Sequence, residues 1–456
     1  MRYKSTLKNN TILLTFGTIV NKGFQFIAVY LYSRWLSIEQ YGEFDVLCTY
    51  ISLLLPVITL STQEAMFRLA IENEQSKKKY ISSALVFDLL LFFIASVVIV
   101  LIFPNKREIA ILFSFYLLSE EMATYLRGVL RTIKRLDLFS YGMVLQTAFI
   151  FLFSTLFILK FELGLKGILL GYAIGTFLGD IFLFVSGKWY LFFRFSSVSL
   201  KSVKEMTTYS IPLIPNEISW WVMNASDRQI INLFFGDSAN GIYAIAHKIP
   251  AICSLIFNMF SISWQQEIVE RVERKEISET NIIFNKFIAV LATFCSIVVA
   301  SNYFFFYYFW DKKYFLAINY APILIFAAFE IAIIQFMGGI QTAFKQTKSI
   351  GKSTVLGGAF NVIIHLILIR YIGLYAAALS TAISNFIIIV VRHFNVSRYI
   401  KLRLNPLNVG LIAVFIYFVL TSFYHLSLVF SIINLLLSLI VCACVNKNFL
   451  KSLLNR

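Results

Sequence analysis

Long unbroken runs of apolar residues recur along the whole chain, and they constrain its fold more than any other feature. A helix of about 20 apolar residues crosses the hydrocarbon core of a membrane. A barrel of the outer-membrane type would instead show segments of about 10 residues in which polar and apolar side chains alternate. The runs at 85–103 and 409–424 do not alternate. We therefore expect an all-α polytopic membrane protein.

Fourteen segments have the length and apolar character of a membrane-spanning helix. Their expected limits are 11–33, 44–70, 81–103, 109–131, 139–160, 167–189, 208–235, 241–268, 282–309, 318–344, 352–370, 374–394, 406–424 and 427–446. Only 14% of the residues are charged, against about 25% in soluble proteins. The first run follows charged residues, as in a secretion signal, but no small-residue cleavage pattern ends it. It is expected to remain as the first helix.

The basic residues predict the orientation of these spans. With the N-terminus in the cytoplasm, 28 of the 40 Lys and Arg residues fall on the cytoplasmic side, 8 fall outside and 4 fall within spans. Cytoplasmic loops of membrane proteins are enriched in Lys and Arg. Both termini are therefore expected in the cytoplasm, and the chain in a bacterial inner membrane. The same bias accounts for the net charge of +16 without a nucleic-acid partner.

A weak internal repeat indicates two similar halves. The segment 163–174 matches 372–383 at several Gly, Leu, Ala and Ile positions, and 41–42 matches 240–241. Both offsets correspond to six spans, which gives the halves the same orientation and a pseudo-twofold axis along the membrane normal. The expected domains are a first six-helix bundle, a second six-helix bundle and two further helices, at 1–205, 206–400 and 401–456. A cleft between two such bundles is a usual place for a transported substrate.

Polar and aromatic side chains are concentrated on one face of the expected span 208–235. These residues are Asn216, Glu217, Trp220, Trp221, Asn224, Asp227 and Arg228. Spacings of four and seven residues keep them on the same face of a helix. Because polar and ionisable groups are costly in lipid, we expect this face to line a cavity.

Three basic residues within spans are candidates for binding an anionic group. Lys22 lies near the middle of the first span, and Arg228 and Lys248 are expected at similar depths in spans seven and eight. Cations around one cavity attract a phosphate or a pyrophosphate. The alternative is that the acids Glu217 and Asp227 simply neutralise Arg228 and Lys248.

The same two acids are the candidates for ion coupling. A transporter driven by an ion gradient needs a carboxylate that exchanges a proton or sodium. Glu217 and Asp227 share the polar face of span seven. A structural ion pair or a solvated helix end is the competing interpretation for each of them.

No motif for covalent chemistry or metal binding is present in the sequence. It contains no HExxH or GxSxG, its five cysteines form no CxxC pair, and its four histidines are scattered without ligand spacing. The tripeptide Gly351-Lys352-Ser353 lacks the upstream glycine of a phosphate-binding loop, so we interpret it as the start of a helix. We therefore expect a protein that is not an enzyme and has no cofactor or metal.

The segment YSIPLIPNEISWWVMNASDRQIINLFFGDSANGIYAIAHKIP at 209–250 resembles the signature of the polysaccharide biosynthesis flippase family, the Wzx-like branch of the MATE/MOP superfamily. Four shorter segments support the resemblance: SRWLSIEQYGEFDV at 33–46, TQEAMFRLA at 62–70, SWQQE at 263–267 and GLYAAALSTAISN at 373–385. Together they extend it over roughly 1–396. The last two expected spans add little to it.

The resemblance implies a flippase that moves an undecaprenyl-pyrophosphate-linked oligosaccharide across the cytoplasmic membrane by alternating access. The substrate would be a repeat unit of O-antigen, for lipopolysaccharide, or of capsule. Transport would be antiport, driven by a proton or sodium gradient. The residues implied to hold the pyrophosphate are Lys22, Arg228 and Lys248, with Arg68 near the entrance. Membrane lipids and the polymerase or ligase of the same pathway are the implied partners.

Three alternatives share parts of this description. A peptidoglycan lipid-precursor flippase has the same fold and a basic cavity but matches the 209–250 segment less well. A MATE-type exporter of small cations would favour an acidic cavity, which Lys22, Arg228 and Lys248 oppose. A polysaccharide polymerase or ligase usually needs a sizeable outer loop, and the expected outer loops are all short.

Overall fold

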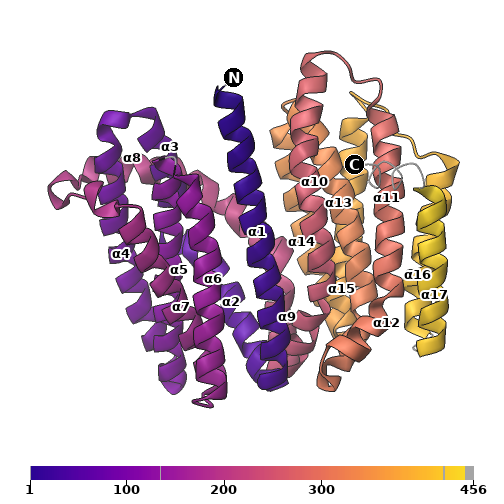
Figure 1. The fold of residues 1–456 in the computed structure, drawn as a ribbon, viewed down its shortest axis with the longest axis horizontal. Coiled ribbons are helices and arrows are strands. Elements are labelled where there is room, and N and C mark those ends of the chain that lie inside the picture. The colour runs from indigo at the N-terminus through magenta and orange to yellow at the C-terminus, as the bar shows by residue number, and fades with distance from the viewer. Residues whose placement is uncertain (1, 134, 425–426, 447–456) are drawn as a thin grey trace. The chain divides into compact units, whose positions relative to one another are not determined.

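The computed structural model describes residues 2–133, 135–424 and 427–446, and in these residues every regular element is helical, which confirms the all-α prediction (Figure 1). The chain divides into two compact units, Met1–Trp221 and Val222–Arg456. This division falls inside the long helix α9, Ile214–Ala246, whereas the sequence places a boundary between residues 205 and 206. The two-bundle organisation with a pseudo-twofold axis stays a prediction.

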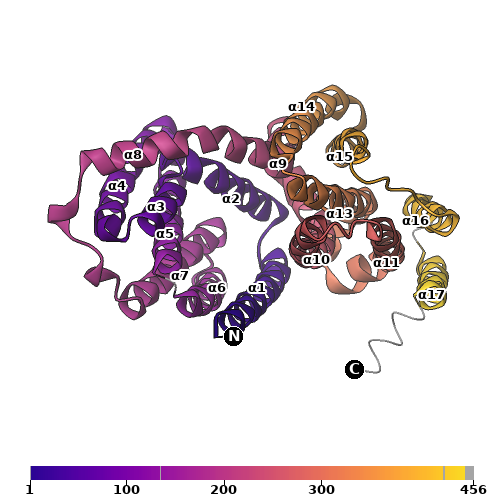
Figure 2. The same ribbon diagram turned by 90° about the horizontal axis from the view of Figure 1, so that it is seen from above.

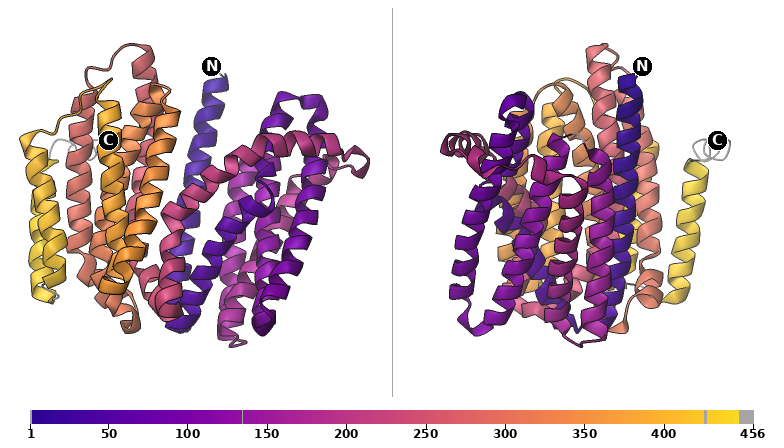
Figure 3. Two further views of the ribbon diagram at one scale, coloured as in Figure 1. Left: turned by 180° about the vertical axis from the view of Figure 1, so that it is seen from behind. Right: turned by 60° about the vertical axis from the view of Figure 1, so that its left-hand side comes forward.

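The N-terminal unit contains α1 to α8 and the start of α9. The bounds are α1 Arg2–Trp35, α2 Ile38–Ile58, α3 Thr62–Glu72, α4 Lys77–Ile102, α5 Arg107–Thr132, α6 Leu136–Leu159, α7 Gly164–Ser186 and α8 Leu200–Ser210. Within this unit α7 packs against α5 and α6, and α4 packs against α5 (Figure 3).

Glycines at one-turn spacing bring α6 and α7 unusually close. A Cβ atom on Gly171 would lie 2.2 Å from Ser154 Oγ, and one on Gly175 would lie 2.4 Å from the backbone nitrogen of Ile150. Small residues permit such close approach between membrane helices, where dispersion and polar contacts drive association. Gly171 and Gly175 therefore have no room for a side chain.

The expected span 44–70 is two helices in the structure, because the chain breaks after α2. Pro56 lies in the last turn of α2, and Leu60 and Ser61 both adopt a positive φ of 52°. Proline removes a backbone donor and disturbs the helix around it. The continuation, α3, starts at Thr62 and is only 11 residues long.

The C-terminal unit contains most of α9 and all of α10 to α17. The bounds are α10 Lys248–Glu273, α11 Thr280–Ala300, α12 Asn302–Phe304, α13 Ala321–Ala343, α14 Thr347–Ile372, α15 Tyr375–Val396, α16 Pro406–Tyr424 and α17 Leu428–Val445. Helix α13 is the most buried of them and packs against α10, α11 and α15 (Figure 2). The expected spans 208–235 and 241–268 are divided differently in the structure: α9 bends at Gly236, where φ is 77°, and continues to Ala246.

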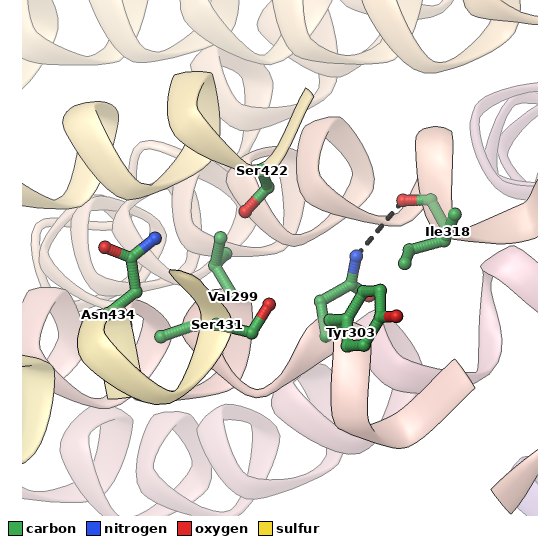
Figure 4. Close-up of a pocket in the computed structure, with 8 residues that line it drawn as sticks. Val299, Tyr303, Ile318, Ser422, Ser431 and Asn434 are labelled. Carbon is green, nitrogen blue, oxygen red and sulfur yellow. Dashed lines mark hydrogen bonds between the residues drawn. The ribbon is translucent and has the colours of Figure 1, made fainter. Parts of the chain in front are cut away.

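Helices α16 and α17 attach to α11 and to the end of the short helix α12. Figure 4 shows Ser422 of α16 and the α17 residues Ser431 and Asn434 around a small polar hollow beside Val299 and Tyr303. Amide side chains join these helices to their neighbours: Asn408 Nδ2 of α16 donates to Asn285 Oδ1 of α11 at 2.8 Å, and Asn434 Nδ2 of α17 donates to Thr421 Oγ1 of α16 at 3.4 Å.

Eleven helices of the described residues are long and apolar enough to cross a membrane, or up to twelve if the bent pair α9 and α10 forms one span. This supports a chain that crosses the membrane many times. The count of fourteen stays a prediction, because α1 is not among these eleven helices, and α9 and α10 meet the criteria only together, as a bent pair. Lys134 and the last ten residues, which contribute to the expected charge bias, lie outside the described residues.

Candidate functional site

The predicted site residues belong to both units, and each unit has its own polar constellation. Lys22, Arg68, Glu217 and Trp221 belong to the N-terminal unit, whereas Asp227, Arg228 and Lys248 belong to the C-terminal unit. The side chains of Asn216, Trp220 and Asn224 lie outside the described ones. The polar face of span seven is thus split between the units, just past Trp221.

Lys22 lies on α1 among amide side chains. Its Nζ donates to Gln25 Oε1 at 3.0 Å, and Gln25 Nε2 donates to Asn21 Oδ1 at 3.3 Å. Asn21 Oδ1 also accepts from the hydroxyl of Thr147 on α6. Within the described residues no carboxylate lies within ion-pair distance of Lys22, so its charge stays available to an anion.

Arg68 has a different environment. It is exposed on α3, and its Nη2 lies 2.7 Å from Glu72 Oε1, four residues along the same helix. A pair of this kind is typical of a solvated helix surface. The structure therefore gives Arg68 a local acidic partner, which weakens its case as a head-group ligand.

Asp227 faces a histidine that the sequence interpretation left aside. Its Oδ1 lies 3.2 Å from Nδ1 of His365 on α14, an ion-pair distance, although the angles do not make a hydrogen bond. Asp227 Oδ2 lies 3.0 Å from Thr381 Oγ1 on α15 and 3.4 Å from the hydroxyl of Tyr243. Asn361 Nδ2 donates to Thr381 Oγ1 at 3.1 Å. A carboxylate and an imidazole thus meet at the junction of three helices.

This Asp227–His365 pair is almost sealed from its surroundings. His365 is fully buried, and Asp227 is 8% exposed. A net charge is costly at such a place, so the buried carboxylate depends on the polar groups that α14 and α15 bring to it.

One sequence signal could have found His365. Asn361 and His365 lie four residues apart on an otherwise apolar helix, so both point to the same face. Two polar side chains on one face of an apolar span indicate that a polar group packs against that face. Its partner, however, lies more than a hundred residues earlier in the chain, and no local pattern reveals such a contact.

Arg228 and Lys248 are half-buried in the C-terminal unit. Lys248 is the first residue of α10 and directly follows His247, whose ring packs edge-on against Tyr243 at 4.9 Å between centroids. The structure therefore places Lys248 at a helix start, whereas the sequence placed it well inside a span.

The remaining predicted residues lie near the start of α9. Trp221 donates its Nε1–H to the carbonyl oxygen of Thr49 on α2 at 2.8 Å, which fixes the indole against the N-terminal unit. Glu217 is exposed. Between the two acids proposed for ion coupling, only Asp227 occupies a buried polar site.

The N-terminal unit also buries acidic side chains, between α3, α4 and α5. Thr62 donates its hydroxyl to Asp88 Oδ1 at 2.5 Å, and Gln63 Nε2 donates to Glu121 Oε1 at 2.6 Å. Both acids are at most 2% exposed. Their polar partners are neutral groups of α3, which helps to explain why this short helix stays packed in the unit.

Comparisons with known proteins agree with the family resemblance. The model of a family described as polysaccharide biosynthesis protein matches residues 7–265. A relative from Haloferax volcanii, described as a probable low-salt glycan biosynthesis flippase, Agl15, is 21% identical over 434 residues, covering 89% of this chain and 86% of the relative.

Two solved structures show the same fold. The lipid II flippase MurJ, in an inward closed conformation, has a TM-score of 0.71 at 15% identity, with 97% of this chain and 100% of that chain covered. The Vibrio cholerae MATE transporter VcmN has a TM-score of 0.55 at 12% identity, with 87% and 97% covered.

These relatives are flippases and transporters, and the chain has many helices that can cross a membrane. The family match covers more than half of the sequence, including the helices that carry Lys22, Arg228 and Lys248. The predicted family is confirmed. The chain belongs to the polysaccharide biosynthesis protein family.

Proposed function

We propose that this protein flips a polyprenyl-pyrophosphate-linked oligosaccharide from the inner to the outer leaflet of a bacterial inner membrane. O-antigen and capsule repeat units are the substrates of this class. The proposal is supported by three basic residues, Lys22, Arg228 and Lys248, which lie in the matched region 7–265 and which the sequence pattern predicts to be in membrane helices. A cation at the bilayer centre costs about 3 kcal/mol or more, so its presence calls for a charged ligand or partner.

Lys22, Arg228 and Lys248 are the proposed ligands of the pyrophosphate. Lys22 has the strongest support, because its recorded hydrogen-bond acceptor is an amide and not an acid. Arg68 is a weaker member of the set, since Glu72 partly neutralises it. Trp221 and the residues Asn216, Trp220 and Asn224 of the same helix are proposed to face the oligosaccharide.

A saccharide carrier is favoured over the two related transport functions. Export of small cations would require an acidic binding site, and three cations oppose it. Transport of a peptidoglycan precursor involves the same kind of anionic lipid head group, and the fold is shared with the lipid II flippase. The family match and the glycan flippase relative favour other lipid-linked saccharides.

Coupling to an ion gradient is proposed to use Asp227, with His365 as its partner. The pair can take up or release one ion where three helices meet, so its occupancy can favour one conformation over another. A proton and a sodium ion both fit the carboxylate, and transport by either would be antiport. Glu217 is the second candidate. Both termini are proposed to lie in the cytoplasm, as the charge bias of the loops indicates.

The test is the double substitution Arg228→Ala and Lys248→Ala in a strain that lacks the chromosomal gene. Each lost cation–phosphate contact is worth about 1.5 to 3 kcal/mol, so flipping is expected to fall at least about tenfold per residue. Lipid-linked oligosaccharide should then accumulate in the inner leaflet, as measured by mass spectrometry of extracted lipids after labelling of the outer leaflet.

The matched control is Arg271→Ala, which removes a half-buried arginine already paired with Glu267 and Glu279. Protein in the membrane is quantified for each variant. Full flipping by the double variant would remove the pyrophosphate site from the proposal. Normal flipping together with unpolymerised repeat units in a full deletion would instead indicate an enzyme of the pathway.

A further inference from the structure

A cavity of about 390 Å³ lies between the first turns of α14 and the end of α15. Its lining includes the three basic residues Lys348, Lys352 and Arg398, and its neutral polar groups include Ser349 and Asn395. Among the described residues, no acidic side chain lines it. At about 1.5 Å of rise per residue, Lys352 lies roughly 20 Å along α14 from His365. The cavity is therefore separate from the Asp227–His365 pair.

Lys348, Lys352 and Arg398 bring three positive charges to one cavity. In the part of the chain that the structure describes, no ion pair joins Lys348, Lys352 or Arg398 to a carboxylate. Like charges around one hollow repel each other and raise its positive potential. The start of α14 adds the partial positive charge of a helix N-terminus. An anion in the cavity would reduce the repulsion between the three cations and would be attracted to the start of α14.

A fourth positive charge lies directly behind the cavity wall. Arg392 is 5% exposed and donates from Nε to Oγ of Ser353, a lining residue, at 3.1 Å. Its other donors reach Thr354 Oγ1 at 3.1 Å and the carbonyl oxygen of Ile334 at 2.9 Å. All these acceptors are neutral, so the guanidinium charge adds to the field in the cavity.

Apolar residues continue from the cavity along the outer surface of the same two helices. Leu356 lines the cavity and is 40% exposed; Val355 and Phe360 of α14 and Phe394 of α15 are exposed as well. Exposed apolar side chains on a membrane helix face lipid chains. A ligand with a phosphate head and hydrocarbon chains therefore matches the surface better than a soluble anion does.

We propose that this cavity binds the phosphate head group of an anionic phospholipid from the cytoplasmic leaflet. Basic pockets between membrane helices on this side are known to take such head groups, and the predicted topology places the start of α14 and the end of α15 in the cytoplasm. Two residues of the tripeptide Gly351-Lys352-Ser353, Lys352 and Ser353, thus line the proposed phosphate site, although the tripeptide is not a phosphate-binding loop.

The experiment compares two triple variants of the full chain, purified in nanodiscs that contain phosphatidylglycerol and phosphatidylcholine. The cavity variant carries Lys348→Gln, Lys352→Gln and Arg398→Gln. The control variant carries Lys204→Gln, Lys401→Gln and Arg403→Gln, which remove the same charge from exposed positions outside the cavity. Native mass spectrometry counts the lipids that remain bound after release into detergent.

The wild-type and control proteins are expected to retain phosphatidylglycerol in preference to phosphatidylcholine. The cavity variant should lose this preference by about tenfold or more, since each basic residue near the surface strengthens anionic-lipid binding severalfold. Lys352→Gln alone should show an intermediate loss, which guards against a folding defect in the triple variant. Equal retention of phosphatidylglycerol in the two triple variants would refute the proposal.

A separate arm adds inorganic phosphate at millimolar concentration to the wild-type protein. Binding of a phospholipid by both its head and its chains predicts that the bound phosphatidylglycerol stays. Complete displacement by inorganic phosphate would overturn the lipid assignment in favour of a soluble phosphate. None of these outcomes depends on whether the protein flips a saccharide, so the test stands apart from the proposed function.

Discussion

The Asp227–His365 pair allows a quantitative test of whether the site is charged or neutral. Nδ1 of His365 and Oδ1 of Asp227 are 3.2 Å apart. At an effective dielectric constant of about 20, two unit charges at that distance attract by about 5 kcal/mol. A neutral hydrogen-bonded contact would contribute only about 1 kcal/mol. The two states therefore predict clearly different coupling energies.

A double-mutant cycle measures this coupling. Asp227→Asn and His365→Gln are made singly and together, and the free energy of unfolding is determined for the full chain in mixed micelles titrated with a denaturing detergent. Removing one partner of a buried ion pair leaves a buried charge and costs about 3 to 5 kcal/mol. Because removing both avoids that penalty, we expect a coupling energy of about 3 kcal/mol.

The control is Thr381→Val in the same assay. It removes one neutral contact to Asp227 and should cost about 1 to 2 kcal/mol. Additive effects of the two single substitutions, with a coupling energy below about 0.5 kcal/mol, would refute the charged pair. In that case the pair could not act as the site where one ion changes the balance between helices.

Two further predictions concern packing and buried polar contacts. Gly175→Ala should destabilise the protein by about 1 to 3 kcal/mol, because the new Cβ would lie 2.4 Å from the backbone of Ile150. Gly410→Ala in α16 should be neutral or stabilising in the same unfolding assay, because the new Cβ would meet no atom within 4 Å beyond its chain neighbours and the backbone of its own helix. Arg392→Met should lower the free energy of unfolding by about 2 kcal/mol or more, since Ser353, Thr354 and Ile334 lose a hydrogen-bond donor. Thermal unfolding of the purified chain measures this effect. An unchanged midpoint would show that the three contacts do not stabilise the protein.

The positions of most helices could be predicted from the sequence. Apolar runs such as 85–103 and 409–424 correspond to α4 and α16 in the structure. This success has a local cause, because a membrane helix satisfies its own backbone hydrogen bonds and needs only enough apolar length. The prediction was weakest where a backbone break depends on its surroundings, as at Leu60 and Ser61 and at Gly236.

The candidate site could be predicted only in part. The sequence identified Asp227 as a polar residue that cannot face lipid, and the structure confirms that it is buried. It did not identify His365, which lies at ion-pair distance from Asp227; the alternative that it left open was that Asp227 and Glu217 neutralise Arg228 and Lys248. The ion pair between Arg68 and Glu72 follows from their spacing of four residues on one helix, a local pattern that the sequence contains.

What the sequence by itself determined is the class of protein: apolar runs of membrane-spanning length, a basic bias of alternate loops, and a segment at 209–250 that is typical of one family. These properties depend on composition and local order along the chain. Only the tertiary structure decided which charges meet. The contact between Asp227 and His365, and the cavity formed by Lys348, Lys352 and Arg398, join residues from different helices. Such contacts follow from how helices pack, because the packing of many side chains selects the arrangement and no short segment encodes it.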